Sequence, residues 1–359
     1  MKFHVKRIVP SVMDVMMRSK FFIIICIAGM LILPSCDKDD EDEDEMKPSI
    51  SGEMTYSLPA YAKVGTTIDL QVSGVTAPEE SKITYRWVSI ALLKDTVWGK
   101  SCTITVPDSL GDFSIVLTAS ADGYYDKTTT KYLTSIKTGS DGSLTGIPAA
   151  ADSIQDARDG QWYNITSAGS LLWFAENLNW EGAGSGYAKT DAVGAVLGRL
   201  YTWKDATGGV SATGLGQGPQ GACPEGWSVP TKEDWEDLAK ALGGEELAFE
   251  TTWKGLGDNV MVANAAFNGY KFWEYTPDCN PENQFGWAAL SAGSCTNNYD
   301  NYSGLCKYGF WWSASEMSAD NAYYRYIYYN RPDFDVNYTD KDGFGASVRC
   351  VKLNVNVEE

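Results

Sequence analysis

The sequence predicts an all-β sandwich followed by an α+β domain, with an acidic tether at the N-terminus. Two patterns predict the domains. Residues 47–137 alternate apolar and polar side chains in short runs, whereas residues 154–354 hold one strong helical pattern among glycine-rich loops. Hydrophobic residues make up 44% of the chain and aromatic residues 13%, which is a globular composition. A length of 359 residues exceeds one ordinary domain, so we expect two.

Charge and histidine content exclude several function classes. The chain has 29 basic and 47 acidic residues, a net charge of -18, and no basic stripe of the kind that phosphate binding needs. No nucleic-acid partner is therefore expected. The only histidine is His4, so the mature protein has no imidazole if its N-terminus is removed. A Ser-His-Asp triad, a Cys-His dyad and a histidine-ligated zinc are then excluded, and the protein is predicted not to be an enzyme.

The first residues have the features of an export signal. Phe21 to Leu33 is an unbroken apolar run of 13 residues that follows two basic residues. As a helix it spans about 20 Å, too short for a bilayer core of roughly 30 Å, so residues 1–35 are predicted to be a signal peptide. Leu33-Pro34-Ser35-Cys36 resembles a bacterial lipobox, which implies acylation of Cys36; the alternative is a plain secretory peptide with a stray cysteine.

Residues 36–46 are predicted to be a lipidated acidic tether. Asp37 to Glu45 contains eight acidic residues and Lys38, and such a run does not fold because like charges repel and nothing apolar is available to bury. The sequence Cys-Asp-Lys-Asp-Asp-Glu, which begins at Cys36, resembles the surface-export signal of Bacteroidota lipoproteins. The resemblance implies a protein that is anchored in the outer membrane by its lipid and exposed at the cell surface.

Residues 47–137 have the strand spacing of a small antiparallel sandwich. Alternating runs, separated by Gly, Pro and Asp-Gly turns, begin at Thr67, Ile83, Cys102 and Phe113. The later runs resemble strands of immunoglobulin-like or polycystic-kidney-disease-like repeats. Trp87 is predicted to be the core tryptophan and Cys102 a buried free thiol. Nothing in this region points to catalysis, so we expect a spacer.

The C-terminal domain follows a linker, predicted at residues 138–153 from its small, polar, Gly- and Pro-containing sequence. Its one strong helix pattern begins after Thr231, which can cap the first turn together with Asp234. An apolar stripe at i, i+3, i+4 and i+7 follows from Trp235 to Leu242. Gly243-Gly244 is predicted to end this helix.

Six segments of this domain occur in an order typical of one family: Leu172–Asn179, Gly198–Trp203, Cys223–Thr231 with Trp235, Phe310–Glu316, Ala322–Arg325 and Gly345–Lys352. Together they resemble the Fibrobacter succinogenes major paralogous (FISUMP) domain. The resemblance implies a C-type-lectin-like fold related to the formylglycine-generating enzymes. Those enzymes hold copper with a C-terminal pair of reactive cysteines. The final strand here has only Cys350, so that activity is not carried over.

The lectin-like fold implies a disulfide between Cys223 and Cys350, which would tie the ends of the domain together. Cys279, Cys295 and Cys306 remain in a Gly- and Asn-rich stretch, where one pair and one leftover cysteine are expected, with Cys295–Cys306 favoured. A redox or metal triad is the alternative. It requires cations that stabilise thiolates, and only Lys307 is near in sequence.

Calcium is the one cofactor that the fold suggests, because lectin-like domains often place calcium and sugar on the long loop. Oxygen ligands are available in that stretch from Asp278, Glu282, Asn283, Asn297, Asn298 and Asp300. The Glu-Pro-Asn and Gln-Pro-Asp tripeptides of calcium lectins are absent, however, and such residues are usually turn formers. We therefore predict no metal, with calcium as the alternative.

Tyrosines give the main indication of a binding surface, because nine of the 20 lie between residues 299 and 338. Tyrosine offers a large rigid contact area at low entropic cost. The predicted ligand-binding residues are Tyr326, Tyr328, Tyr329, Asn330, Asp333, Phe334, Asp335, Asn337 and Tyr338. The alternative is a tyrosine-rich strand on a solvated sheet. The region also resembles the hypervariable face of lectin-like proteins that retroelements diversify.

These observations favour a surface lipoprotein that binds an extracellular glycan or protein through its C-terminal domain, in adhesion or recognition. One alternative is an accessory or tip subunit of a fimbria. Another is an exported enzyme that uses paired carboxylates from Glu176, Asp234 or Glu316, although no spacing places any two of them across a cleft.

Overall fold

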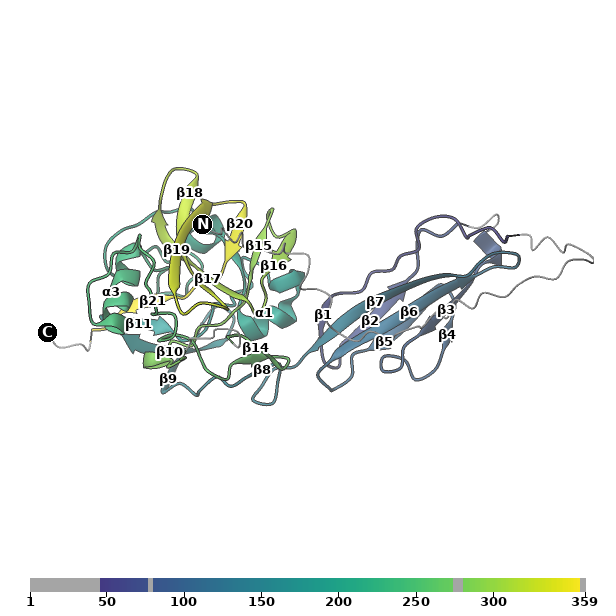
Figure 1. The fold of residues 1–359 in the computed structure, drawn as a ribbon, viewed down its shortest axis with the longest axis horizontal. Helices are drawn as coiled ribbons and strands as arrows, with labels where there is room; N and C mark the ends of the chain where they lie inside the picture. The colour runs from purple at the N-terminus through teal and green to yellow at the C-terminus, as the bar shows by residue number, and fades with distance from the viewer. Residues whose placement is uncertain (1–45, 77–79, 274–279, 356–359) are drawn as a thin grey trace, which may run out of the picture. The chain divides into compact units, whose positions relative to one another are not determined.

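The protein is mostly β, with few helices and several sheets, in a computed structural model that describes residues 46–76, 80–273 and 280–355 (Figure 1). Cys36, Asp278 and Cys279 lie outside these residues, so the acylation of Cys36 is not tested. Within the described ranges, no helix is both long and apolar enough to cross a membrane.

The N-terminal region, residues 47–137, has two sheets that share one core. One sheet has the strand order β1 (Tyr61–Lys63), β7 (Lys127–Ile136), β6 (Asp112–Ser120), β3 (Thr84–Val88) and β4 (Val97–Trp98); the other pairs β2 (Thr67–Gln71) with β5 (Ser101–Thr105). A short 3₁₀ turn, η1 (Glu80–Lys82), precedes β3. Trp87 is fully buried in this core and donates its indole N–H to the Gly99 carbonyl at 2.9 Å. Cys102 is a buried free thiol, as predicted.

The C-terminal region contains four further sheets among the described residues. The first sheet has the strand order β21 (Val351–Leu353), β11 (Leu171–Phe174), β10 (Trp162–Ala168), β9 (Asp152–Gln155), and the second has β12 (Tyr201–Thr202), β20 (Phe344–Ala346), β15 (Ser294–Thr296), β16 (Asn301–Ser303). The third has the order β17 (Tyr308–Glu316), β18 (Asn321–Tyr328), β19 (Phe334–Asp340), and the fourth has β14 (Tyr270–Lys271), β13 (Ala266–Phe267), β8 (Leu144–Thr145). Because β21 pairs with β11, the end of the domain lies beside its beginning. The residues predicted as a linker contain β8 and the start of β9.

Helix α3 (Lys232–Gly243) confirms the predicted helix and its caps. The Asp234 amide donates to the Thr231 hydroxyl at 3.2 Å, and the Thr231 amide donates to the Asp234 carboxylate at 2.8 Å, which completes a capping box. Gly244 ends the helix with a left-handed backbone, φ 68°. The predicted stripe is buried, with Trp235 packed 5.1 Å from the ring of Trp173.

Short helices and turns connect the remaining strands: α1 (Asp191–Leu197), α2 (Trp203–Thr207), η2 (Tyr187–Lys189) and η3 (Gln284–Gly286). The family segment Gly198–Trp203 changes from strand to helix at Thr202. This threonine ends β12 and caps α2, because its hydroxyl accepts the Asp205 amide at 3.1 Å.

Candidate functional site

The tyrosine-rich segment forms strands β18 and β19, and strand alternation divides its side chains between two faces. Across β17 and β18, Tyr308 lies opposite Tyr328 and Phe310 lies opposite Tyr326. Ring contacts join these four residues to Tyr324 and to Phe344 of β20. We call this set the aromatic face: Tyr308, Phe310, Tyr324, Tyr326, Tyr328 and Phe344. Sequence reasoning missed its members from β17 and β20, because only the strand register brings them beside Tyr326.

Rings of the aromatic face contact one another in a continuous row. The ring centroids of Tyr308 and Tyr328 are 4.3 Å apart, those of Tyr308 and Phe310 5.3 Å, and those of Phe310 and Tyr326 5.7 Å. Tyr324 is buried at 9% exposure, and the other five rings are half-buried. Phe310, Tyr326 and Phe344 pack against a buried cluster that contains Tyr324, and the half-buried rings keep part of their surface exposed.

Polar groups border the aromatic face at β19. Asp335 lies opposite Tyr326 and Asn337 lies opposite Tyr324, so both share this face. Asn337 is exposed, and Arg331 forms an ion pair with Asp335. Burial, and to a smaller extent the charge of Asp335, raises the pKa of Tyr326. Its hydroxyl therefore stays protonated and able to donate at neutral pH.

The structure corrects the prediction for Phe334 and Asp335. Phe334 is fully buried against Trp253, at 5.4 Å between ring centroids, because odd and even positions of β19 point to opposite faces. The carboxylate of Asp335, at 4% residue exposure, accepts the Thr252 hydroxyl at 3.0 Å and pairs with Arg331. Neither side chain is available to a ligand.

The other predicted residues of the segment are accessible but do not form one surface. Tyr338 is 48% exposed on the face opposite Tyr326, where it contacts Tyr323. Asp333 accepts the Gly255 amide at 3.0 Å and so anchors a neighbouring loop. Asn330 is exposed in the turn between β18 and β19, and the half-buried Tyr329 packs 4.7 Å from Tyr328.

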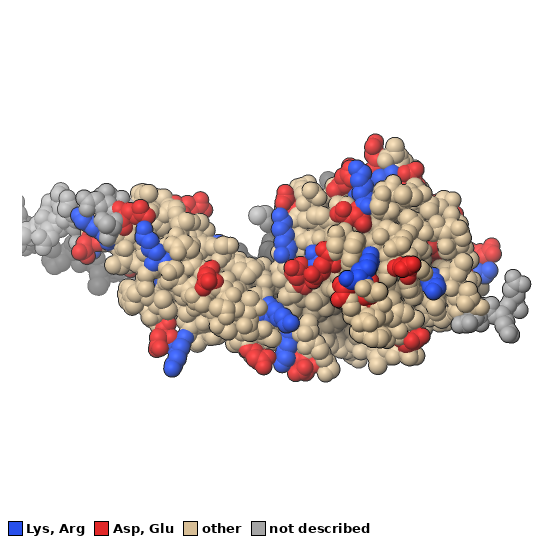
Figure 2. Space-filling view, turned by 180° about the vertical axis from the view of Figure 1, so that it is seen from behind, with Lys and Arg blue, Asp and Glu red and all other residues tan. Residues whose placement is uncertain are grey.

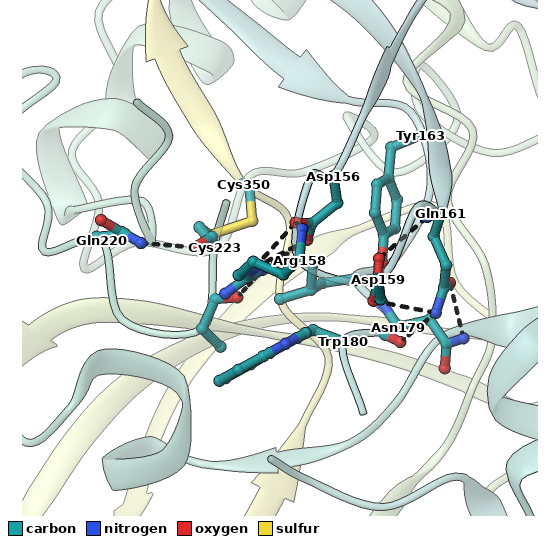
Figure 3. Close-up of polar contacts among 12 residues, drawn as sticks. Asp156, Arg158, Asp159, Gln161, Tyr163, Asn179, Trp180, Gln220, Cys223 and Cys350 are labelled. Carbon is teal, nitrogen blue, oxygen red and sulfur yellow. Dashed lines mark hydrogen bonds and ion pairs between the residues drawn. A yellow bond between two sulfur atoms is a disulfide. The ribbon is translucent and has the colours of Figure 1, made fainter. Parts of the chain in front are cut away.

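The cysteines confirm one predicted disulfide and correct the other. Cys223 and Cys350 are bonded, with their Cα atoms 5.8 Å apart (Figure 3). Cys295 and Cys306 are free. The pairing of β15 with β16 places Tyr302, not Cys306, opposite Cys295. Burial raises the pKa of both free thiols to about 12, so they remain protonated and unreactive.

The model of the Fibrobacter succinogenes major domain matches residues 166–352. The chain belongs to this family. No curated protein matches the chain.

The motif residues that mark the Fibrobacter succinogenes major domain lie mainly in its interior. Trp173, Trp235, Trp312 and Arg349 are each at 0% exposure. The Arg349 guanidinium donates to the Asn177 side chain at 2.8 Å and to the backbone carbonyls of Phe174, Trp287 and Ala288. Buried polar groups need such partners, so this arginine holds separate segments together. The family motifs therefore describe the buried frame of the domain rather than its exposed surface.

Three of the residues proposed as calcium ligands have other partners within the protein. Asp300 pairs with Lys189 at 2.9 Å, Asn283 accepts the Ala288 amide at 2.7 Å, and Glu282 accepts the Gln284 side chain at 3.1 Å. Asn297 and Asn298 take left-handed backbone angles in the turn between β15 and β16. In the part of the chain that the structure describes, no group of three or more Cys, Asp or Glu side chains is arranged to hold a metal.

The three carboxylates considered for catalysis each have a local partner. Asp234 accepts the Gly216 amide at 2.6 Å besides capping α3, and Glu316 pairs with Lys341 at 2.6 Å. Glu176 accepts the Asn164 amide at 2.7 Å, and burial raises its pKa. None of the contacts found among the described residues joins two of these carboxylates.

Proposed function

We propose that this protein is a surface-exposed lipoprotein that binds an extracellular glycan or protein through the aromatic face of its C-terminal domain. In this proposal the domain has a C-type-lectin-like fold, an immunoglobulin-like region spaces it from the membrane, and Cys36 carries the lipid. The protein binds rather than catalyses. The observation that carries the proposal is the continuous row of half-buried rings formed by Tyr328, Tyr308, Phe310 and Tyr326.

The energetics of exposed rings support a contact role. Half-buried tyrosines present apolar edges and hydroxyl groups together, which is the composition of protein interfaces and of surfaces that meet polar ligands. Neighbouring rings already restrict one another, so little side-chain entropy remains to be lost on binding. Arg331 and Asn337 add donors and acceptors at the border.

Charge has a smaller part in this proposal. Figure 2 shows Lys and Arg side chains scattered among Asp and Glu side chains, with uncharged surface between them. On the face drawn, recognition by a broad patch of one sign is therefore not favoured. Contacts made by rings and hydroxyl groups fit the proposal better.

Two single alanine variants, one on each face of the sheet that contains β18 and β19, test the proposal. Arrays of glycans and extracellular proteins, probed with a soluble chain that begins at Asp37, should first identify a partner. Tyr328→Ala should then weaken binding by about 2 kcal/mol, as for an interface anchor. Tyr338→Ala removes a more exposed ring from the other face and should leave binding unchanged. Equal binding by the two folded variants would reject the aromatic face as the site.

A further inference from the structure

A cavity lies apart from the aromatic face, beside the disulfide. It has a volume of about 600 Å³ and lies between the turn after β9 and the loop that leads from Gln220 to Trp227. Its walls include Gln155, Arg158, Gln220, Glu225 and Trp227. Ile154, Ala157 and Pro224 also line the cavity, so its wall combines polar and apolar side chains.

Arg158 is fixed in one orientation at this cavity (Figure 3). Its guanidinium donates Nε and Nη2 to the fully buried Asp156 carboxylate, with Nη2 to Oδ2 at 2.7 Å. Nη2 also donates to the Ala222 carbonyl at 2.8 Å. The guanidinium lies 4.2 Å from the ring centroid of Trp180. A group held in this way loses little entropy when it binds a ligand.

Hydrogen-bonding capacity remains at the cavity wall. Nη1 of Arg158 makes no hydrogen bond with any described residue. Gln220 donates its amide N–H to the Cys223 carbonyl at 3.3 Å, which leaves its Oε1 oxygen to accept. Glu225 is exposed and has no partner among the described residues. The cavity therefore offers one fixed donor near two acceptors.

Charge balance selects the class of ligand. Asp156 neutralises Arg158 through its paired contacts, and Glu225 adds a negative charge, so an anionic ligand is disfavoured. A single exposed carboxylate does not hold a cation. A neutral ligand with many hydroxyl groups can accept from Arg158 and donate to Gln220 and Glu225. We propose that this cavity is a binding subsite for a neutral carbohydrate, separate from the aromatic face.

Calorimetric titration of the soluble chain from Asp37 tests this site. The probes are neutral oligosaccharides of glucose, galactose, mannose or xylose, three to six units long, with heparin hexasaccharide as the anionic comparison. At least one neutral probe should bind in the micromolar to millimolar range. Gln220→Ala and Glu225→Gln should each weaken it about fivefold to tenfold. Gln217→Ala, at an exposed glutamine of the same loop that does not line the cavity, is the matched control.

Three results would overturn the subsite: no neutral probe binds, heparin binds more tightly than every neutral probe, or Gln220→Ala and Glu225→Gln both bind like the unmodified protein. Tyr328→Ala separates this inference from the aromatic face. It should keep the binding of the neutral probe. If it abolishes that binding while the two cavity variants keep it, the carbohydrate belongs to the aromatic face and not to this cavity.

Discussion

Loss of the Cys223–Cys350 disulfide should destabilise the C-terminal domain by a large part of its total stability. The bonded cysteines are 127 residues apart. For a loop of this length, the chain-entropy model gives a stabilisation of about 5 kcal/mol at 25 °C. A domain is typically stable by only about 5–15 kcal/mol. The double variant Cys223→Ala/Cys350→Ala should therefore be close to unfolding at 37 °C.

Urea unfolding followed by tryptophan fluorescence measures this effect. Only Trp87 and Trp98 precede residue 160, so 11 of the 13 tryptophans report on the C-terminal domain. With a denaturant slope of about 2 kcal/mol per molar urea, a loss of 5 kcal/mol lowers the midpoint by about 2.5 M. Addition of a reductant to the unmodified protein should produce a similar shift, and it should leave the double variant unchanged.

A matched control separates the bond from the packing of its sulfur atoms. Cys295→Ala removes a buried thiol that forms no disulfide, so it should cost only the energy of a small cavity, about 1 kcal/mol. A double variant whose midpoint falls by no more than that of Cys295→Ala would refute the entropic reasoning. Peptide mapping without reduction should also recover the two cysteine peptides linked. Two free thiols at these positions would show that the disulfide is absent.

Further predictions concern the anchor, the core and the pH response. Cys36→Ala should release the protein from the membrane fraction, whereas alanines at Lys38–Asp40 should leave it anchored but protected from added protease; equal protease access would contradict the export signal. Arg349→Met should lower the free energy of unfolding by at least about 3 kcal/mol, because it leaves buried carbonyls unpaired. In the same urea assay, the control Lys352→Met, at an exposed residue, should change this free energy by less than about 0.5 kcal/mol. Burial raises the pKa of Asp234 to about 6, above the unfolded value near 3.9. The Asp234 carboxyl therefore stays protonated to a higher pH in the native state than in the unfolded state. The free energy of unfolding should then fall from pH 4 to pH 6, by up to about 3 kcal/mol from this group, and a slope that is unchanged in Asp234→Asn would reject this cause.

Much of the frame was predictable because its signals are local. The capping pair of Thr231 and Asp234 and the stripe from Trp235 to Leu242 lie within one stretch of sequence, and they form α3 as expected. Helices α1 and α2 were not predicted, since each has seven residues or fewer and lacks a full apolar stripe. Helices this short are not stable alone and depend on tertiary packing.

The aromatic face, where we propose that the ligand binds, was only partly predictable, for a physical reason. Counting tyrosines selected the segment that contributes most rings to the aromatic face, but one-residue alternation decides which of those rings share a face. Tyr326 and Tyr328 lie on the aromatic face, whereas Phe334 and Tyr338 lie on the other. Tyr308 and Phe344 join this face through strand pairing and ring packing that are distant in sequence, so composition alone did not reveal them.

The residues that mark the family and the residues proposed to bind have different physical roles. Trp173, Trp235 and Arg349 are fully buried, and a change at any of them alters packing or leaves a carbonyl unpaired. Tyr328 is half-buried and Gln220 is exposed, so substitution there should cost less stability. A family built on such a frame can keep one fold while its surface takes different ligands. Membership of the family therefore predicts how this domain folds, and the ligand must be identified by experiments on the exposed rings and on the Arg158 cavity.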